Sequence, residues 1–230
     1  MIRMEREIIA RMQEGNRRSS NDPLLVSSQV RNCIKDRHPE LSVAQRSAVE
    51  GLLLSRERIV GLDGVAGAGK TTVLSVIREA AQADGYRVGG FAPTSCAAQK
   101  LAEAGMETST LQKHLACGEQ PDMGEKLLYV LDESSLASTR QLHEFVHRLQ
   151  PNDRVLLVGD RRQHEAVEAA RPFAKLKDAG MFTVRLEEIV RQRDPELKRV
   201  VEQLARGQVH EAIENRPRSP LLVPSSRRTS

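Results

Sequence analysis

Hydrophobic residues follow two patterns along the chain, and the two patterns alternate. Continuous apolar runs predict strands at 58–64, 86–94, 126–133, 154–160 and 183–189. Between them, hydrophobic residues recur at helical spacing and predict helices at 71–84, 95–105, 136–149 and 197–207. Strands that are apolar throughout are typical of a parallel sheet buried on both faces. The alternation predicts an α/β fold with a mostly parallel, doubly wound sheet, flanking helices, and ligands beyond the carboxyl ends of the strands.

The residues before position 42 lack this alternation. Their pattern predicts a short amphipathic helix, a turn-rich linker and a second helical stretch, at 4–13, 15–23 and 24–37. Ser42 and Gln45 then match the Ser-x-x-Gln capping box, which predicts the start of the next helix. We therefore expect a helical lead-in and linker, an α/β domain, and a disordered basic tail, at 1–41, 42–215 and 216–230.

Charge and composition limit the kinds of partner and compartment that we expect for the chain. The net charge is +4, but the last 40 residues hold nine Lys/Arg against five Asp/Glu, so the body is not a general polycation. An aromatic content of 3% disfavours stacking platforms for bases. Cys33, Cys96 and Cys117 are far apart, which indicates reduced thiols rather than a zinc site or disulfides. No apolar run approaches the ~20 residues of a membrane span, and the start lacks a signal-peptide centre, so we expect a cytoplasmic protein without a membrane span.

Residues 64–72, GVAGAGKTT, lie between a predicted strand and a predicted helix. They fit the P-loop pattern Gly-x4-Gly-Lys-Thr, in which backbone N–H groups and a helix N-terminus hold phosphates. Lys70 is expected to bridge the β- and γ-phosphates, and the Thr71 hydroxyl to bind Mg²⁺. The residues assigned to the nucleotide in this loop are Gly64, Gly67, Gly69, Lys70, Thr71 and Thr72.

Asp132 and Glu133 end another predicted strand and supply the carboxylates that a P-loop requires. Asp132 is expected to hold Mg²⁺ through water, and Glu133 to orient and deprotonate the attacking water. The next strand ends in Gly159-Asp160-x-x-Gln163. This motif disfavours a kinase for a small metabolite, and the lack of an Asn-Lys-x-Asp base reader disfavours a GTPase.

Six motifs occur in the order typical of superfamily 1 helicases: GLDGVAGAGKTT, FAPTSCAAQKL, STLQKHL, YVLDESSLAS, LLVGDRRQHEAVEAARPF and LEEIVRQ. Their wording resembles the helicase region of conjugative relaxase-helicases, multidomain proteins that nick and unwind plasmid DNA for transfer. The resemblance runs from about residue 3 to residue 215 and implies that 42–215 is the first of two RecA-like P-loop motor domains. Nothing in the sequence resembles the second motor domain or the nicking domain of that family.

The resemblance implies further roles, each beside a simpler interpretation. Gln45 matches the glutamine that reads adenine, which implies ATP, but the capping box explains it equally well. Asp160 and Gln163 match the motif that senses the γ-phosphate. Arg191 matches an arginine that reaches the γ-phosphate, or is a surface charge. The positions that match DNA-facing motifs, or alternatively a strand-to-helix turn with an N-cap, are Pro93, Thr94, Ser95, Thr110 and His114. Cys96 stands where the family suggests a basic residue.

These assignments predict an ATP- and single-stranded-DNA-binding motor domain that hydrolyses ATP with Mg²⁺. Lys70, Asp132, Glu133, Gln163 and Arg191 are its predicted catalytic residues. Because the second motor domain is not matched, we expect a truncated chain with weak ATPase activity and no processive unwinding. The alternative is a non-catalytic remnant that binds nucleotide or DNA, or that docks on another relaxase or conjugation protein.

Overall fold

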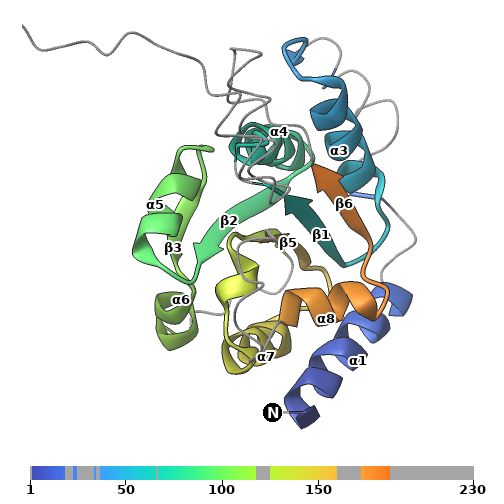
Figure 1. Cartoon of the computed structure of the whole chain (residues 1–230), viewed down its shortest axis with the longest axis vertical. Coiled ribbons are helices and arrows are strands. Elements are labelled where there is room, and N and C mark those ends of the chain that lie inside the picture. The colour runs from blue at the N-terminus through green and yellow to red at the C-terminus, as the bar shows by residue number, and fades with distance from the viewer. Residues whose placement is uncertain are drawn as a thin grey trace, which may run out of the picture. The chain divides into compact units, whose positions relative to one another are not determined.

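Six parallel strands form one open sheet in the computed structural model (Figure 1). The structure describes residues 2–18, 23–24, 34, 37–65, 67–117, 125–159 and 172–186. The order across the sheet is β3-β2-β4-β5-β1-β6. The strands are β1 (Ile59–Gly64), β2 (Tyr86–Ala92), β3 (Glu107–Thr110), β4 (Lys126–Leu131), β5 (Arg154–Gly159) and β6 (Thr183–Leu186).

Helices cover both faces of the sheet (Figure 1). One face packs against α3 (Val43–Leu54), α4 (Lys70–Ala83) and α5 (Ser95–Ala102). The other face packs against α1 (Ile2–Arg18), α6 (Leu111–Cys117), α7 (Thr139–Arg148) and α8 (Pro172–Asp178). The predicted doubly wound α/β sheet is therefore confirmed.

Strand β4 shows why the sheet is covered on both sides. Leu128 and Val130 are buried in the core layer that includes α4, whereas Leu127, Tyr129 and Leu131 are buried in the layer that includes α7. Consecutive side chains of a strand point to opposite faces, so a strand that is apolar at every position requires two hydrophobic layers. The continuous apolar pattern of this strand is the direct cause of the two-layer architecture.

Helix α1 is longer than the pattern of 4–13 predicts, because it continues to Arg18 and includes the first four residues of the predicted linker. Both its apolar side and its polar last turns pack on the domain. Ile8 and Met12 are 2% and 1% exposed in the same core layer as α7. The Asn16 side chain bonds to the start of β1, where its Oδ1 accepts from the backbone nitrogens of Arg58 and Ile59 at 3.0 and 3.2 Å.

Three short elements were not predicted from the pattern: β3, α6 and α8. β3 has the sequence ETST and is half-buried at the sheet edge, so it lacks an apolar run. The helix expected at 136–149 is instead a 3₁₀ turn, Ser134–Leu136, followed by α7, because Ser138 and Gln141 form a capping box that starts a new helix. The predicted helix at 197–207 and the predicted tail lie outside the described residues.

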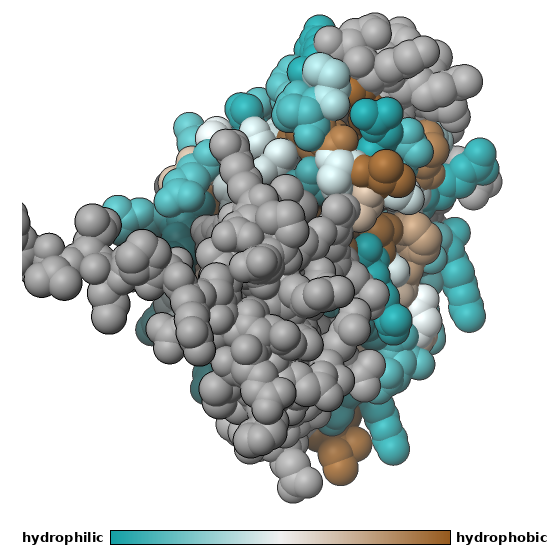
Figure 2. All heavy atoms as spheres, turned by 45° about the horizontal axis from the view of Figure 1, so that its top comes forward, coloured by the Kyte–Doolittle hydropathy of each residue, from teal (hydrophilic) through white to brown (hydrophobic). Residues whose placement is uncertain are grey.

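The described surface is mostly polar. On the face shown in Figure 2 the visible hydrophobic patches are small and separate. Among the described residues, the large hydrophobic side chains exposed by more than a third are Ile2, Val43, Leu54, Leu136 and Phe182. Single exposed apolar side chains of this kind are normal on a folded domain. None of the described helices is both long and apolar enough to cross a membrane.

Candidate nucleotide and DNA site

The P-loop connects β1 to α4, as its sequence predicts. Gly67 and Gly69 both have a φ of 82°, a left-handed conformation that glycine adopts without strain. Gly69 is the residue before the first turn of α4, so Lys70, Thr71 and Thr72 form the helix N-terminus, where Thr71 and Thr72 are exposed. The loop therefore presents the exposed hydroxyls of Thr71 and Thr72, and the positive end of α4, at one edge of the sheet.

Gly64 and Lys70 approach each other closely within this loop. A Cβ atom on Gly64 would lie 2.9 Å from Lys70 Cγ, so only glycine leaves room for the lysine stem. Lys70 Nζ donates to the backbone oxygens of Gly64 and Val65 at 2.6 and 3.3 Å. The lysine ammonium is thus held inside the curve of the loop, where a phosphate-binding lysine is required.

The acidic motif lies at the carboxyl end of β4, near the P-loop. The backbone nitrogen of Asp132 donates to Phe91 O of β2, and Asp132 Oδ1 accepts from the nitrogen of Glu133, both at 2.8 Å. Glu133 has a φ of 47°, the one positive φ among described non-glycine residues. A left-handed backbone is unusual for glutamate and is found most often at functional turns.

Ser134 fixes the turn that carries this glutamate. The serine is fully buried, and its Oγ donates to Val158 O of β5 at 2.8 Å. Gly159, at the end of β5, lies against the same turn, since a Cβ there would be 2.7 Å from Ser135 Oγ. Ser134 therefore bonds the end of β4 to β5, and Ser135 packs against the end of β5, although neither serine was assigned a role from the sequence.

Burial and the surrounding groups have opposite effects on the pKa of the Asp132 carboxyl. Burial raises the pKa of the Asp132 carboxyl above its usual value, while the hydrogen bond from Glu133 and the positive charges of Lys70 and Lys100 act to lower it. The P-loop lysine is thus near enough to the predicted magnesium ligand for its charge to favour the ionised carboxylate. Lys100, in the last turn of α5, was not predicted as part of the site. Lys100 is far in sequence from both nucleotide motifs, so nothing in the sequence indicated that it lies near Asp132.

The residues predicted to face DNA lie at the neighbouring strand ends. Ala92 pairs with Thr110 in the register of β2 and β3, so the turn 93–95 and the start of α6 are at the same edge of the sheet. Thr94 is exposed and caps α5, because its Oγ1 accepts from Ala97 N at 3.2 Å. Thr110 Oγ1 likewise accepts from Lys113 N at 3.2 Å. Both threonines therefore have the structural role that the simpler interpretation assigns, and their DNA contacts stay predictions.

His114 is packed more deeply than a simple surface contact requires. Its ring lies 4.3 Å from the Phe91 ring, and 5.8 and 6.0 Å from those of Tyr129 and Phe145. The histidine is half-buried, so part of it remains accessible from outside. This cluster joins α6 to the sheet beneath it.

Gln45 is 4% exposed and takes part in the predicted capping box. Its Oε1 accepts from Ser42 N at 3.0 Å, and its backbone nitrogen donates to Ser42 Oγ at 3.2 Å. The capping function is confirmed, and the adenine contact stays a prediction. Asp160, Gln163 and Arg191 lie outside the described residues.

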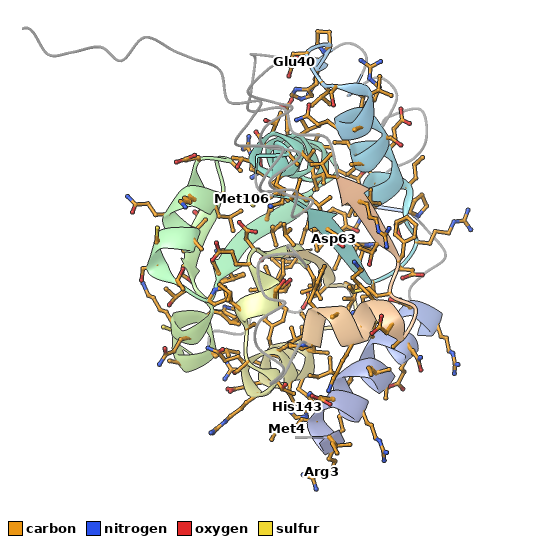
Figure 3. The ribbon with its side chains drawn as sticks, viewed as in Figure 1. Arg3, Met4, Glu40, Asp63, Met106 and His143 are labelled. Carbon is orange, nitrogen blue, oxygen red and sulfur yellow. The ribbon has the colours of Figure 1, made fainter. Side chains whose placement is uncertain are left out.

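One further ion pair adjoins the P-loop. Asp63, which precedes Gly64, forms an ion pair with Lys177 of α8. The two side chains are largely buried, at 14% and 13% exposed. Figure 3 shows Asp63 near the carboxyl end of β1. The pair fixes α8 to the base of the phosphate loop.

The comparisons with known proteins agree with this geometry. A family model described as an AAA domain matches residues 40–219. The chain belongs to the AAA domain family. It is 36% identical over 218 residues to a probable conjugal transfer protein TraA of Sinorhizobium fredii, covering 93% of this chain and 19% of that protein.

Other relatives include both conjugation proteins and helicases. The ATP-dependent RecD2 DNA helicase of Deinococcus radiodurans is 33% identical over 74% of this chain and 24% of its own length. The multifunctional conjugation protein TraI of Escherichia coli is 30% identical over 76% of this chain and 10% of its own length. The chain thus spans a quarter or less of the length of these relatives.

The crystal structure of Pif1 helicase from Candida albicans has the same fold, with a TM-score of 0.55 and 18% identity over 79% of this chain and 49% of that one. Together these similarities confirm the RecA-like P-loop fold and the resemblance to the first motor domain of conjugative relaxase-helicases. The protein is a helicase-like AAA domain related to conjugal transfer proteins and helicases.

Proposed function

We propose that this AAA domain binds and hydrolyses ATP with Mg²⁺ and couples hydrolysis to single-stranded DNA in a conjugative relaxase-helicase. The observation that carries the proposal is that the P-loop and Asp132 follow β1 and β4, the two strands that pair with β5, and that the Lys70 charge acts on the Asp132 carboxyl. The DNA-facing candidates follow β2 and β3, on the other side of β4 in the strand order. The two predicted sites are therefore neighbours at one sheet edge.

The residues present fit both ATP and its magnesium ion. Gly64 leaves space for the Lys70 stem. Gly67 and Gly69 adopt the left-handed backbone that leads the loop into the N-terminus of α4. The Thr71 hydroxyl and the Asp132 carboxylate are oxygen donors, which Mg²⁺ prefers. Bound Mg²⁺ supplies charge neutralisation on the β- and γ-phosphates. Lys70 adds a second positive charge at the same oxygens.

Glu133 is the proposed general base. It follows Asp132 directly, and its half-buried side chain is carried by a turn that Ser134 fixes to β5. A carboxylate held in this way can orient a water molecule and accept its proton as the γ-phosphate is attacked. Gln163 and Arg191 are proposed as γ-phosphate contacts on the strength of the family motifs alone.

Pro93, Thr94, Ser95, Thr110 and His114 are proposed to contact single-stranded DNA. Support comes from the shared edge of β2 and β3 and from the exposure of Thr94 and Ser95. Lys113, exposed on α6 beside His114, adds a positive charge for a phosphate. Thr110 and His114 are half-buried, so they are expected to support the contact rather than to dominate it.

The decisive experiment compares Glu133→Gln with the parent chain in phosphate release and ATP binding, with and without single-stranded DNA. We expect DNA-stimulated release to be lost in Glu133→Gln while ATP binding persists, because only the base is removed. Glu103→Gln, an exposed acid at the end of α5, is the matched control and should keep both activities. A parent chain that binds ATP or DNA without releasing phosphate would favour the alternative, a non-catalytic binding or docking module for other conjugation proteins.

For the 230-residue chain assayed alone, we propose slow ATP turnover and no processive unwinding. In helicases with two motor domains, an arginine from the second domain contributes to the transition state, and such arginines are worth roughly 10³–10⁵ in rate. Robust strand displacement by the purified chain would contradict this part of the proposal.

A further inference from the structure

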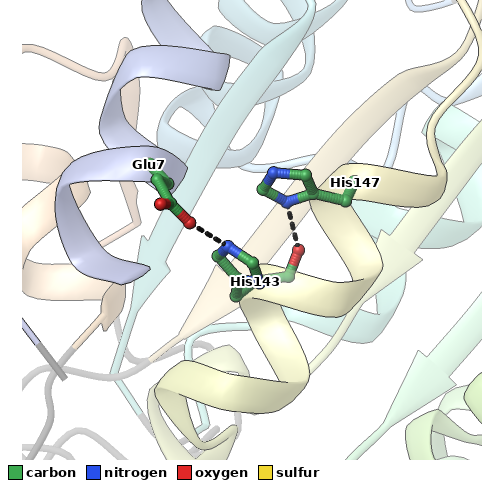
Figure 4. Close-up of side chains that lie close together, drawn as sticks. All are labelled: Glu7, His143 and His147. Carbon is green, nitrogen blue, oxygen red and sulfur yellow. Dashed lines mark hydrogen bonds and ion pairs between the residues drawn. The ribbon is translucent and has the colours of Figure 1, made fainter. Parts of the chain in front are cut away.

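Three potential metal ligands meet where α1 packs on α7, on the face of the sheet opposite α4. His143 and His147 are one turn apart on α7, and Glu7 reaches them from α1 (Figure 4). One ligand atom from each residue lies within 4.8 Å of the other two. Figure 3 shows His143 at this junction, next to Met4 of α1 and away from Asp63. The cluster is thus separate from the nucleotide site.

Hydrogen bonds orient both imidazoles at this junction. His147 Nδ1 lies 2.8 Å from the backbone oxygen of His143, so Nδ1 carries the proton and Nε2 keeps its lone pair. Metal-binding histidines almost always donate their second ring nitrogen in this manner, which fixes the ring orientation. His143 Nε2 lies 2.6 Å from Glu7 Oε2 and donates its proton to the carboxylate, so this proton must leave when both atoms bind a cation.

The spacing suits one small cation. Zinc ligands at about 2.0–2.2 Å in a tetrahedron lie roughly 3.4 Å from one another. The three ligand atoms lie within 4.8 Å of one another, so they must draw closer to reach this spacing. His147 is exposed and Glu7 is half-buried, so neither side chain is enclosed by the core. Arg3 is an exposed competitor that pairs with Glu7 Oε1 at 3.3 Å, but exposed ion pairs of this kind are weak and the bond uses the other carboxylate oxygen.

We propose that Glu7, His143 and His147 bind one divalent transition-metal ion, Zn²⁺ being the best match, and that this ion links α1 to α7. Two imidazoles and one carboxylate form a borderline ligand set that suits Zn²⁺ and disfavours Mg²⁺. Water completes the coordination, because His147 is open to solvent. The link adds a cross-helix connection to a contact otherwise made by Ile8, Met12 and the apolar side of α7.

The test uses the 230-residue chain after chelator treatment, without nucleotide, titrated with Zn²⁺ alone in a calorimeter. We expect one equivalent to bind tightly, and His147→Ala and Glu7→Gln each to weaken binding by about tenfold or more. His147→Ala alters an exposed helical position, so folding is preserved. His38→Ala is the matched control, because His38 contacts the carboxylates of Glu40 and Glu79 outside this cluster and should leave Zn²⁺ affinity unchanged.

Hydrogen exchange gives a second measurement that reports the link itself. Zn²⁺ should slow exchange of the α1 amides in the parent chain and have no such effect in His147→Ala. Binding that is unchanged in both cluster variants, or no stoichiometric binding by the parent chain, would overturn the proposal. Binding without slower exchange in α1 would overturn the linking role.

Discussion

Asn16 Oδ1 lies 3.0 Å from the backbone nitrogen of Arg58, a residue 42 positions away in the chain. The same oxygen accepts from Ile59 N, and Asn16 Nδ2 donates to Glu57 Oε2 at 2.8 Å. One side chain near the end of α1 therefore satisfies two backbone donors at the start of β1. It also explains why a polar segment that resembles a linker is helical and docked.

This contact predicts that removing the Asn16 amide destabilises the domain. Asn16→Ala should lower the free energy of unfolding by about 1–3 kcal/mol, because two partly buried N–H groups lose their acceptor. Gln13→Ala, at an exposed position of the same helix, should change stability by less than about 0.5 kcal/mol. Urea unfolding of the two variants decides the matter, and equal midpoints would contradict the assignment.

The close approach of Gly64 to Lys70 predicts a selective loss of nucleotide binding. Gly64→Ala places a methyl group 2.9 Å from Lys70 Cγ and should displace the lysine, reducing ATP affinity by about tenfold or more while the fold persists. Equilibrium binding of a fluorescent ATP analogue measures this loss. The clash should also lower the free energy of unfolding of Gly64→Ala relative to the parent chain, whereas in a Lys70→Ala background the clash is absent and Gly64→Ala should not lower it. An equal loss in both backgrounds would locate the strain elsewhere.

Two adjacent serines should respond differently to the same substitution. Ser134→Ala removes a buried donor to Val158 O and should cost about 1–3 kcal/mol of unfolding free energy. The buried Ser135 Oγ has no hydrogen-bond partner among the described residues, so Ser135→Ala should be neutral or slightly stabilising. Thermal unfolding of both variants provides the comparison. A larger loss in Ser135→Ala than in Ser134→Ala would show that the turn is held differently.

Tyr129 predicts how stability depends on alkaline pH. Burial raises the pKa of this phenol to about 12, with a smaller contribution from Asp153. The unfolded phenol, with a pKa of about 10, loses its proton first, so stability should fall between about pH 10 and pH 12 by up to roughly 3 kcal/mol. Tyr129→Phe should remove this part of the decline and leave only Tyr86 to titrate at 295 nm. A Tyr129→Phe profile parallel to that of the parent chain would refute the prediction.

The elements that sequence predicted well are those whose local pattern and tertiary role agree. β4 and β5 are apolar at nearly every position because both faces are buried, and the P-loop motif requires a strand before it, which is β1, and a helix after it. Motif order also predicts that Lys70 and Asp132 belong to one site, and the Lys70 charge acts on the Asp132 carboxyl in the structure. The strands and the P-loop depend on residues that are near one another in the chain.

The elements that sequence missed depend on distant partners. β3 is polar and forms through pairing with β2, which its own four residues do not encode. The end of α1 is stabilised by β1, and Glu7 meets His143 from 136 positions away. Glu133 has a left-handed backbone next to Ser134, whose Oγ bonds to β5, and no local propensity predicts that contact.

The two-sided burial of β4 also limits how this protein can vary. Leu128 and Val130 face the α4 layer, and Asp132 continues the same alternation toward Lys70 and Lys100. Inserting or deleting one residue in this strand would exchange its two sets of side chains and turn the Asp132 carboxylate away from the lysines. Related chains are therefore free to exchange one hydrophobic residue for another in β4, whereas a change of its length by a single codon would abolish the core packing and the nucleotide site together.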